Sequence, residues 1–357
     1  MVTDKLYIFD LDLPKLSKIL TSWGEPGYRA KQIWGGLYQN LWEKPEDFTN
    51  LSKGLRQRLA DEFAFSHLQP VTDLKSSDGE TEKILFHLPD GQPIETVRMR
   101  YSPSTSPTGT GRGRRTLCIS TQSGCAMGCT FCATGQMGFM RNLTSGEIVE
   151  QVIHFARRLN LQGERVTNIV VMGMGEPFHN YDATMEAIRR LNHPEGMNLG
   201  ARRFTVSTVG LVPQIQQLAK EELQVNLAIS LHAADDELRQ KTMPINRKYP
   251  IAELMKAVRE YIKTTNRRVT FEWALINQVN DTPEQATKLA ELLGGMLVHV
   301  NLIPLNPTEG FEGQASDKAR AANFQEILQK KGIPCTIRMR RGIDIQAGCG
   351  QLASLKK

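Results

Sequence analysis

The chain has 357 residues, of which 40% are hydrophobic and 23% are charged, and its net charge is +6. This length favours about two domains, and the hydrophobic share is enough for a sizeable core. No apolar run approaches the roughly 18 residues that span a membrane, and the N-terminus lacks a signal-peptide pattern. We therefore expect a cytoplasmic protein without membrane contact, whose six cysteines stay reduced and serve as ligands or reactive groups.

The first predicted unit is a small helical domain over residues 1–90. Apolar residues at helical spacing predict helices at 13–20, about 28–43 and about 52–64. Their basic faces lead us to interpret this unit as RNA-adaptor-like. Residues 82–101 alternate and turn at Pro89-Asp90-Gly91, which predicts a β-hairpin. The polar stretch from 102 to 114 predicts a flexible linker and a domain boundary. We assign residues 91–110 to a unit made of the hairpin strand and the linker, and we begin the next domain at residue 111.

From residue 111 the pattern changes to alternating strands and helices. Strands are predicted at about 115–120, 167–172, 203–208, 224–230, 268–275 and 297–302. Helices are predicted at about 144–160, 181–192, 212–220, 251–265, 282–293 and 316–331. Six such units indicate an α/β fold, a parallel sheet curved into a partial (β/α)6 TIM-like barrel over residues 111–345. The functional site of such a barrel lies at the carboxyl ends of its strands.

Arginines gather in two stretches of the chain. They are Arg98, Arg100, Arg112, Arg114 and Arg115 in the first and Arg338, Arg340 and Arg341 in the second. The planar fork of donors on arginine suits phosphate, which favours a nucleic-acid partner. An ordinary solvated basic surface is an equally good interpretation of the charge alone.

Three cysteines directly after the first barrel strand have the spacing Cys-x3-Cys-x2-Cys. These are Cys125, Cys129 and Cys132. Three thiolates so close together, separated by small residues, point to a metal or an iron–sulfur cluster. A structural zinc site usually closes with four ligands, and the sequence has no second cysteine pair to complete it. A four-iron cube held by three thiolates would leave one iron free, although a zinc knuckle with a distant fourth ligand stays an alternative.

Polar residues follow several of the other predicted strands. Gly175 and Glu176 lie in the loop Met172–Pro177 after the second strand, where glycine allows close backbone approach to a ligand. Ser207 ends the third strand, the run from Ser230 through Leu231 to His232 ends the fourth, and Asn306 follows the sixth. We expect these groups to converge on one ligand, although His232 taken singly is more typical of a structural histidine.

The C-terminal segment 346–357 contains Cys349 between two glycines. A cysteine in such a polar, glycine-flanked stretch is a poor core residue, and the glycines leave it accessible. Together with Cys118 it forms a candidate pair of thiols beside the site. A stray surface thiol is the alternative for Cys349. Cys335, at the start of a late strand, is interpreted as a packing residue.

Taken together, these segments resemble the RlmN/Cfr family of radical S-adenosylmethionine (SAM) methyltransferases. The resemblance covers essentially the whole chain. It rests on residues 28–34 and 94–97, the Cys118–Cys132 loop, and residues 172–177, 230–232 and 341–351. It implies that the barrel is a radical SAM core and that the substrate is an adenosine in the peptidyl-transferase centre of 23S rRNA.

The resemblance also implies a role for each candidate residue. Cys125, Cys129 and Cys132 would bind a [4Fe–4S] cluster. SAM would contact Gly175, Glu176, Ser207, Ser230, Leu231, His232 and Asn306. Cys349 would become an S-methylcysteine intermediate, Cys118 its thiol partner in a transient disulfide, and Glu95 the proton acceptor.

The implied reaction uses two SAM molecules per turnover and methylates carbon 2 of the adenine. The first SAM methylates Cys349, and a radical derived from the second activates that methyl group for addition to the base. The implied partners are rRNA, possible transfer RNA substrates and an electron donor such as flavodoxin or ferredoxin, with the enzyme acting as a monomer. Two alternatives stay open: methylation of carbon 8, and a zinc-containing RNA-binding protein without catalysis.

Overall fold

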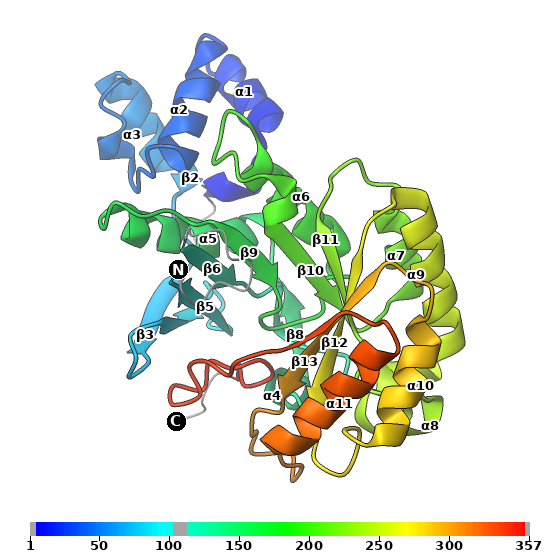
Figure 1. The fold of residues 1–357 in the computed structure, drawn as a ribbon. Coiled ribbons are helices and arrows are strands. Elements are labelled where there is room, and N and C mark those ends of the chain that lie inside the picture. The colour runs from blue at the N-terminus through cyan, green and yellow to red at the C-terminus, as the bar shows by residue number, and fades with distance from the viewer. Residues whose placement is uncertain (1–4, 103–112, 354–357) are drawn as a thin grey trace.

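The computed structural model describes residues 5–102 and 113–353, and a single large sheet organises most of them (Figure 1). Its ten strands lie in the order β14-β13-β12-β11-β10-β9-β6-β5-β4-β3. In chain order the strands are β3 (Gln69–Lys75), β4 (Thr81–His87), β5 (Pro93–Tyr101), β6 (Arg114–Cys118), β9 (Asn168–Val171), β10 (Phe204–Thr208), β11 (Asn226–Ser230), β12 (Val269–Leu275), β13 (Val298–Pro304) and β14 (Cys335–Ile337).

The seven strands from β6 through β9 to β14 run parallel, as expected for a βα barrel. Helices connect them: α5 (Ser145–Asn160), α6 (Tyr181–Asn192), α7 (Val212–Leu218), α8 (Asp236–Thr242), α9 (Ile251–Thr265), α10 (Pro283–Leu293) and α11 (Lys318–Lys330). The prediction of an α/β fold with a partial barrel is confirmed, because the hydrogen-bonded strand order of the described residues runs from β14 to β3 without closing. The short helix α8 was not predicted, and β14 was predicted only as a late strand that starts at Cys335.

The other three strands extend this sheet in antiparallel fashion. Strands β4 and β5 form the predicted hairpin, whose turn contains Gly91 with a φ of 78°. Strand β5 also pairs with β6, so the hairpin continues the sheet of the barrel.

The domain boundaries at residues 90, 110 and 345 stay predictions. Most of the predicted linker, including Arg112, lies outside the described residues.

The predicted N-terminal helices are present as α1 (Leu13–Ser22), α2 (Tyr28–Tyr38) and α3 (Lys53–Glu62). Helix α2 ends five residues before its predicted end, and Leu41 beyond it has a left-handed φ of 60°. Glu150 on α5 fixes the end of this module, because its carboxylate accepts hydrogen bonds from the backbone N–H groups of His67 at 2.8 Å and Leu68 at 3.1 Å. The helical module is therefore anchored to the first helix of the barrel.

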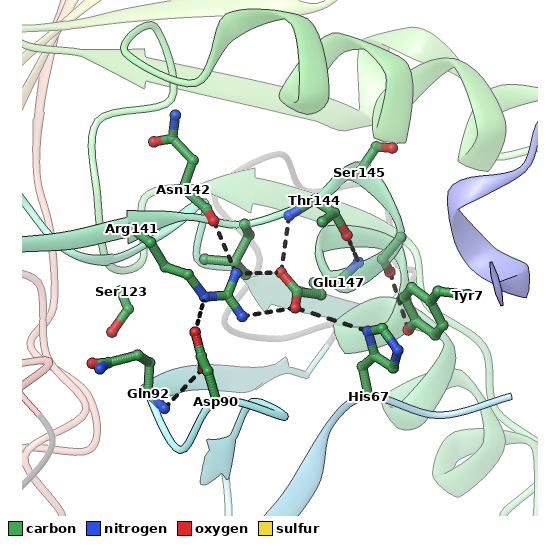
Figure 2. A network of polar contacts seen from close by, with 12 residues as sticks. Tyr7, His67, Asp90, Gln92, Ser123, Arg141, Asn142, Thr144, Ser145 and Glu147 are labelled. Carbon is green, nitrogen blue, oxygen red and sulfur yellow. Dashed lines mark hydrogen bonds and ion pairs between the residues drawn. The ribbon is translucent and has the colours of Figure 1, made fainter. Parts of the chain in front are cut away.

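A small hairpin of β7 (Gln122–Gly124) and β8 (Phe139–Asn142) flanks the cysteine loop. Figure 2 shows how Arg141 on β8 holds it in place. The Arg141 guanidinium donates to both carboxylate oxygens of Glu147 at 2.8 Å and to Asp90 at 2.5 Å. Glu147 also caps α5 by accepting the Thr144 N–H at 2.9 Å. One arginine thus links the cysteine-loop hairpin to α5 and to the β4–β5 turn.

The C-terminal segment crosses the open side of the sheet. In Figure 1 it runs, in red, from the β13 side toward the side of the sheet that holds β3 and β5. Backbone atoms at Gln346 and Cys349 accept hydrogen bonds from Lys83 on β4 and from Asn306 beyond β13, so the segment bridges the two sides. Within 5–102 and 113–353, no helix is long and apolar enough to cross a membrane.

Candidate active site

The three cysteines of the Cys-x3-Cys-x2-Cys loop line one cavity at the carboxyl ends of the strands, with about 1030 Å³ of space between atoms when the part open to solvent is included. The loop is held tightly by backbone contacts. The Cys125 N–H donates to the Gly138 carbonyl at 2.9 Å, and a Cβ on Gly124, whose φ is 71°, would lie 1.9 Å from that oxygen. Only glycine fits at Gly124, and this close approach sets the direction of Cys125.

The three thiols form a donor set that suits an iron–sulfur cluster. Burial raises the pKa of Cys125 to about 12 and the pKa of Cys129 well above its usual value, and the neighbouring thiols raise both further. Such thiols ionise when a bound metal supplies positive charge. Among the described residues, no three His, Cys, Asp or Glu side chains converge as they would around a single ion. Soft thiolates facing a roomy cavity fit a polynuclear cluster.

Glu176 lies in the wall of this cavity, in the loop after β9. Its two carboxylate oxygens accept the backbone N–H groups of Phe178 at 3.0 Å and Val209 at 2.9 Å. Burial raises its pKa to about 7, and these hydrogen bonds oppose that shift. The adjacent Gly175 has a φ of 100°, and a Cβ there would lie 2.6 Å from the Gln122 side chain. The backbone can therefore approach a ligand where a larger residue would not fit.

The ends of β10 and β11 place the next predicted residues on the same cavity. The hydroxyls of Ser207 and Ser230 lie 3.4 Å apart, and both line it. Leu231 is fully buried behind them and donates its N–H to the Glu272 carbonyl at 3.2 Å. Leu231 does not line the cavity with its neighbours, so the structure brings together the two serines but sets Leu231 apart.

His232 is oriented by the backbone around it. Its Nδ1 accepts the Ala274 N–H at 2.9 Å, so its proton resides on Nε2. Burial lowers its pKa to about 3, and Arg239 lowers it further. His232 has a left-handed φ of 58° and packs edge-on against Phe131, with ring centroids 5.0 Å apart. It lines the cavity as a neutral imidazole with one N–H to donate.

Asn306 joins the cavity wall to the C-terminal segment. Its Nδ2 donates to the Cys349 carbonyl at 3.0 Å, whereas its buried Oδ1 has no hydrogen-bond partner. Two residues of the cysteine loop hold the same segment, because Ala133 N–H donates to the Gly350 carbonyl at 2.8 Å and Thr134 Oγ1 to the Leu352 carbonyl at 2.5 Å. The free Oδ1 is a ready acceptor for a bound ligand.

Cys349 lines the same cavity as the three loop cysteines, and its side chain is accessible there. Burial by the surrounding protein raises its pKa, and Arg338 opposes that shift. Cys118 lies half-buried at the end of β6, and its pKa is raised by burial and by the nearby Cys349. All six cysteines are free thiols, so Cys118 and Cys349 are neighbours without a bond between them.

Glu95 on β5 is buried beside this pair and faces the C-terminal segment. Lys83 Nζ lies 2.8 Å from Glu95 Oε1 and 3.1 Å from the Gln346 carbonyl. Burial raises the pKa of Glu95, whereas Lys83 and the backbone N–H of Ala353 lower it. Of these three residues only Cys349 lines the cavity, and Glu95 and Cys118 lie against the C-terminal segment that carries it, while the roles of all three stay predictions.

One residue of the cavity wall, Glu272, was not predicted from the sequence. Glu272 on β12 is a buried carboxylate that lines the cavity and accepts the Asn301 Nδ2 at 2.9 Å. It sits in mid-strand without a motif, so no local signal indicated it. The predicted packing role of Cys335 fits its burial in the main core.

The arginine-rich stretch before the cysteine loop is partly neutralised within the protein. Arg98 pairs with Glu82 at 2.7 Å, and both Arg100 and Arg115 bind Glu164. Clustering in the sequence therefore overstated the charge that this stretch can offer to phosphate.

A partial βα barrel with a Cys-x3-Cys-x2-Cys loop after its first parallel strand defines a radical SAM protein. In agreement, the sequence pattern of the Radical SAM superfamily matches residues 119–291, and that of the ribosomal RNA large subunit methyltransferase N-terminal domain matches residues 6–64. The cofactors of this class are a [4Fe–4S] cluster and SAM, so the alternative of a zinc protein without catalysis is wrong.

Comparison with individual proteins narrows the class further. The chain is 51% identical to a probable dual-specificity RNA methyltransferase RlmN from Chloroflexus aurantiacus, over 97% of this chain and 92% of that protein. It is 46% identical to a ribosomal RNA large subunit methyltransferase N from Nitrosopumilus maritimus, over 95% of both. A crystal structure of a radical SAM methyltransferase from Sphaerobacter thermophilus superposes with a TM-score of 0.92 at 51% identity, covering 97% of this chain and 98% of that one. The chain belongs to the RlmN family of radical SAM RNA methyltransferases.

Proposed function

We propose that this enzyme methylates carbon 2 of adenosine 2503 in 23S rRNA through an S-methylcysteine at Cys349. The observation that carries this proposal is the shared cavity, since Cys349 lines it together with Cys125, Cys129 and Cys132. A methyl carrier must meet SAM at the cluster, and here the C-terminal segment is held there by Asn306, Ala133 and Thr134.

Cys349 is the first nucleophile of the proposed reaction. Its thiolate attacks the methyl carbon of SAM, so that an S–C bond forms and S-adenosylhomocysteine leaves. Burial disfavours that thiolate, and the positive charge of Arg338 favours it, so Arg338 supports the step. The thiol proton is released to solvent at the open side of the cavity.

Cys125, Cys129 and Cys132 would hold the cluster, which when bound would supply the electron that turns a second SAM into a radical able to take a hydrogen atom from the Cys349 methyl group. The activated carbon then bonds to carbon 2 of an adenine unstacked from its RNA, at a cost of a few kcal/mol. Glu95 accepts the proton from carbon 2. The adduct radical gives up its unpaired electron along the route by which the cluster is reduced. The Cys118 thiolate then attacks the Cys349 sulfur, so that an S–S bond forms as the bond from sulfur to the methylene carbon breaks, and that carbon takes up a proton to become the methyl group. The electron donor supplies the two electrons that reduce the disulfide before the next turnover.

This assignment of Glu95 and Cys118 is supported by their places in the sheet. Cys118 on β6 is paired with Val97 on β5, and Glu95 is two residues from Val97 on the same face. One apolar cluster contains Val97, Cys118 and Leu352, and Leu352 belongs to the C-terminal segment. This face of the sheet is therefore turned toward the C-terminal segment with Cys349, which we call the carrier segment.

The experiment that tests the proposal is anaerobic reaction of the reconstituted enzyme with a 23S rRNA fragment whose target adenosine carries deuterium at carbon 2. We expect 2-methyladenosine by mass spectrometry of the digest, with the deuterium lost. Retention of deuterium in a methylated product would indicate carbon 8 and contradict the proposal. The Cys349→Ala variant is the control, which should keep its iron content and form no methylated base.

Two further parts of the proposal concern the partners of the enzyme. We propose that some transfer RNAs are also substrates, which the names of the dual-specificity relatives support. We propose a flavodoxin-type or ferredoxin-type electron donor, because the radical step consumes one electron at the cluster. A monomeric state and a cytoplasmic location stay expectations from the sequence.

A further inference from the structure

Lys83 is a buried cation at the proposed proton acceptor that the proposed reaction leaves without a role. Both Lys83 and Glu95 are about 3% exposed, and Nζ lies 2.8 Å from Glu95 Oε1. The same Nζ lies 3.1 Å from the Gln346 carbonyl, three residues before the methyl carrier. One side chain therefore contacts the proposed base and the backbone of the carrier segment.

The register of the sheet explains how these groups meet. Lys83 on β4 is paired with Val97 on β5, which in turn is paired with Cys118 on β6. Directly paired residues share a face, and so does Glu95, two positions from Val97 along β5. Lys83 reaches Glu95 as a diagonal cross-strand neighbour, a separation that long side chains can span. The row from Lys83 to Cys118 lies beneath the carrier segment.

We propose that Lys83 is a positioning residue for Glu95, holding its carboxylate toward the carrier segment as the anion and tying it to the Gln346 backbone. This inference rests on the proposed role of Glu95 as proton acceptor. A proton acceptor must be ionised, and a buried carboxylate without a partner tends to become neutral instead. Lys83 supplies the compensating charge at the place where the proton is received.

The charges around Glu95 make the direction of its titration clear. Burial raises its pKa, and Lys83 from β4 lowers it, as does the Ala353 backbone N–H from the carrier segment. Cys118 on β6 and Cys349 are neutral thiols whose own pKa values are raised. Removing Lys83 therefore raises the pKa of Glu95, so the carboxylate forms only at higher pH.

A second ion pair on the same two strands provides a matched control. Arg98 and Glu82 are directly paired across β4 and β5, with Nε 2.7 Å from Oε2, and both are buried. They alternate with Lys83 and Val97 along their strands and so lie on the opposite face, away from the carrier segment. Arg98→Met removes a buried cation from the same strands without touching Glu95.

The test compares Lys83→Met, Arg98→Met and Glu95→Gln with the wild type. The single-turnover rate of 2-methyladenosine formation is measured from pH 6 to pH 9.5, after the iron content of each protein has been matched. We expect the acid limb of the Lys83→Met profile to move up by at least one pH unit, with the rate recovering to within about threefold of wild type at the highest pH. The acid limb of Arg98→Met should stay in place.

Hydrogen exchange of the protein without RNA gives a readout apart from activity. Loss of the Gln346 contact should speed amide exchange within residues 342–353 at least tenfold in Lys83→Met and leave it unchanged in Arg98→Met. A wild-type acid limb or wild-type exchange in Lys83→Met would overturn the inference. An equal shift of both properties in Arg98→Met would overturn it as well, because the effect would then be general to the strands.

Glu95→Gln separates this inference from the proposed function. If this variant blocks methylation while Lys83→Met keeps the wild-type acid limb, only the role of Lys83 is wrong. If Glu95→Gln methylates RNA at the wild-type rate, Glu95 is not the proton acceptor and both ideas fall.

Discussion

The two sides of the cavity are built in different ways. On the cofactor side, Cys125, Cys129, Cys132 and Glu176 each follow the strand that positions them, in loops after consecutive parallel strands. On the proposed transfer side, Cys349 lines the cavity from the C-terminal segment, and Glu95 and Cys118 lie against that segment on an antiparallel strand and on the first barrel strand. The residues on the cofactor side thus lie in short stretches of the chain. The residues proposed for the transfer come together only through contacts between segments far apart in sequence.

The largest expected effect is on the cofactor side. Cys129→Ala removes one of three thiolates, and two cannot hold the cluster in place. We expect iron content after anaerobic reconstitution to fall to background and methylation to become undetectable. Cys335→Ala, which removes a core thiol away from the cavity, is the matched control. If Cys129→Ala retained a full cluster, the assignment of the three ligands would be wrong.

On the transfer side, Cys118→Ala should leave the cluster intact and stop the reaction late. Without the attacking thiol, the bond from Cys349 sulfur to RNA cannot be broken, so we expect a covalent protein–RNA adduct and at least a 100-fold fall in free product. The adduct is measured as a shifted band on a denaturing gel. The double variant Cys118→Ala/Cys349→Ala should form none, and an adduct in that protein would exclude Cys349 as its site.

Asn306 touches both sides, and its expected effect is intermediate. Asn306→Ala loses the hydrogen bond to the Cys349 carbonyl and the free Oδ1 at the cavity. At about 1 kcal/mol for each hydrogen bond, the methylation rate should fall about tenfold or more. Asn306→Asp keeps an acceptor and loses the donor, so comparing the two variants separates ligand contact from segment anchoring. If both variants methylated RNA at the wild-type rate, Asn306 would serve neither as a ligand contact nor as an anchor of the segment.

The smallest effect should come from a single anchor of the carrier segment. Thr134→Val removes the hydroxyl that donates to the Leu352 carbonyl and keeps the shape of the side chain. Loss of about 1 kcal/mol corresponds to roughly a fivefold lower methylation rate, with unchanged iron content. Thr134→Ser should restore the wild-type rate, and failure to do so would show that the methyl group matters more than the hydroxyl.

The same contrast explains what the sequence could predict. The cysteine spacing, the strand ends and the β4–β5 turn are local patterns, and the structure has each at its predicted place. Helix α8 escaped prediction because its seven residues carry too little periodicity. The contact of Lys83 with Glu95 and Gln346 has no local signal, because it depends on strand register and on a segment more than 250 residues away.

The backbone anchors of the C-terminal segment would limit how a methyl group on Cys349 can travel in the proposed reaction. Carbonyls on both sides of the sulfur, at Gln346 and at Gly350, are held by donors from β4 and from the cysteine loop. The main chain is thereby fixed before and after Cys349, so its sulfur can move by little more than a rotation about one side-chain bond. In the proposed reaction SAM and RNA must therefore both come to an almost stationary atom, and Cys118 on β6 must reach it from within the sheet. The motion that the proposed reaction needs must therefore come from SAM and the RNA and not from the main chain around Cys349.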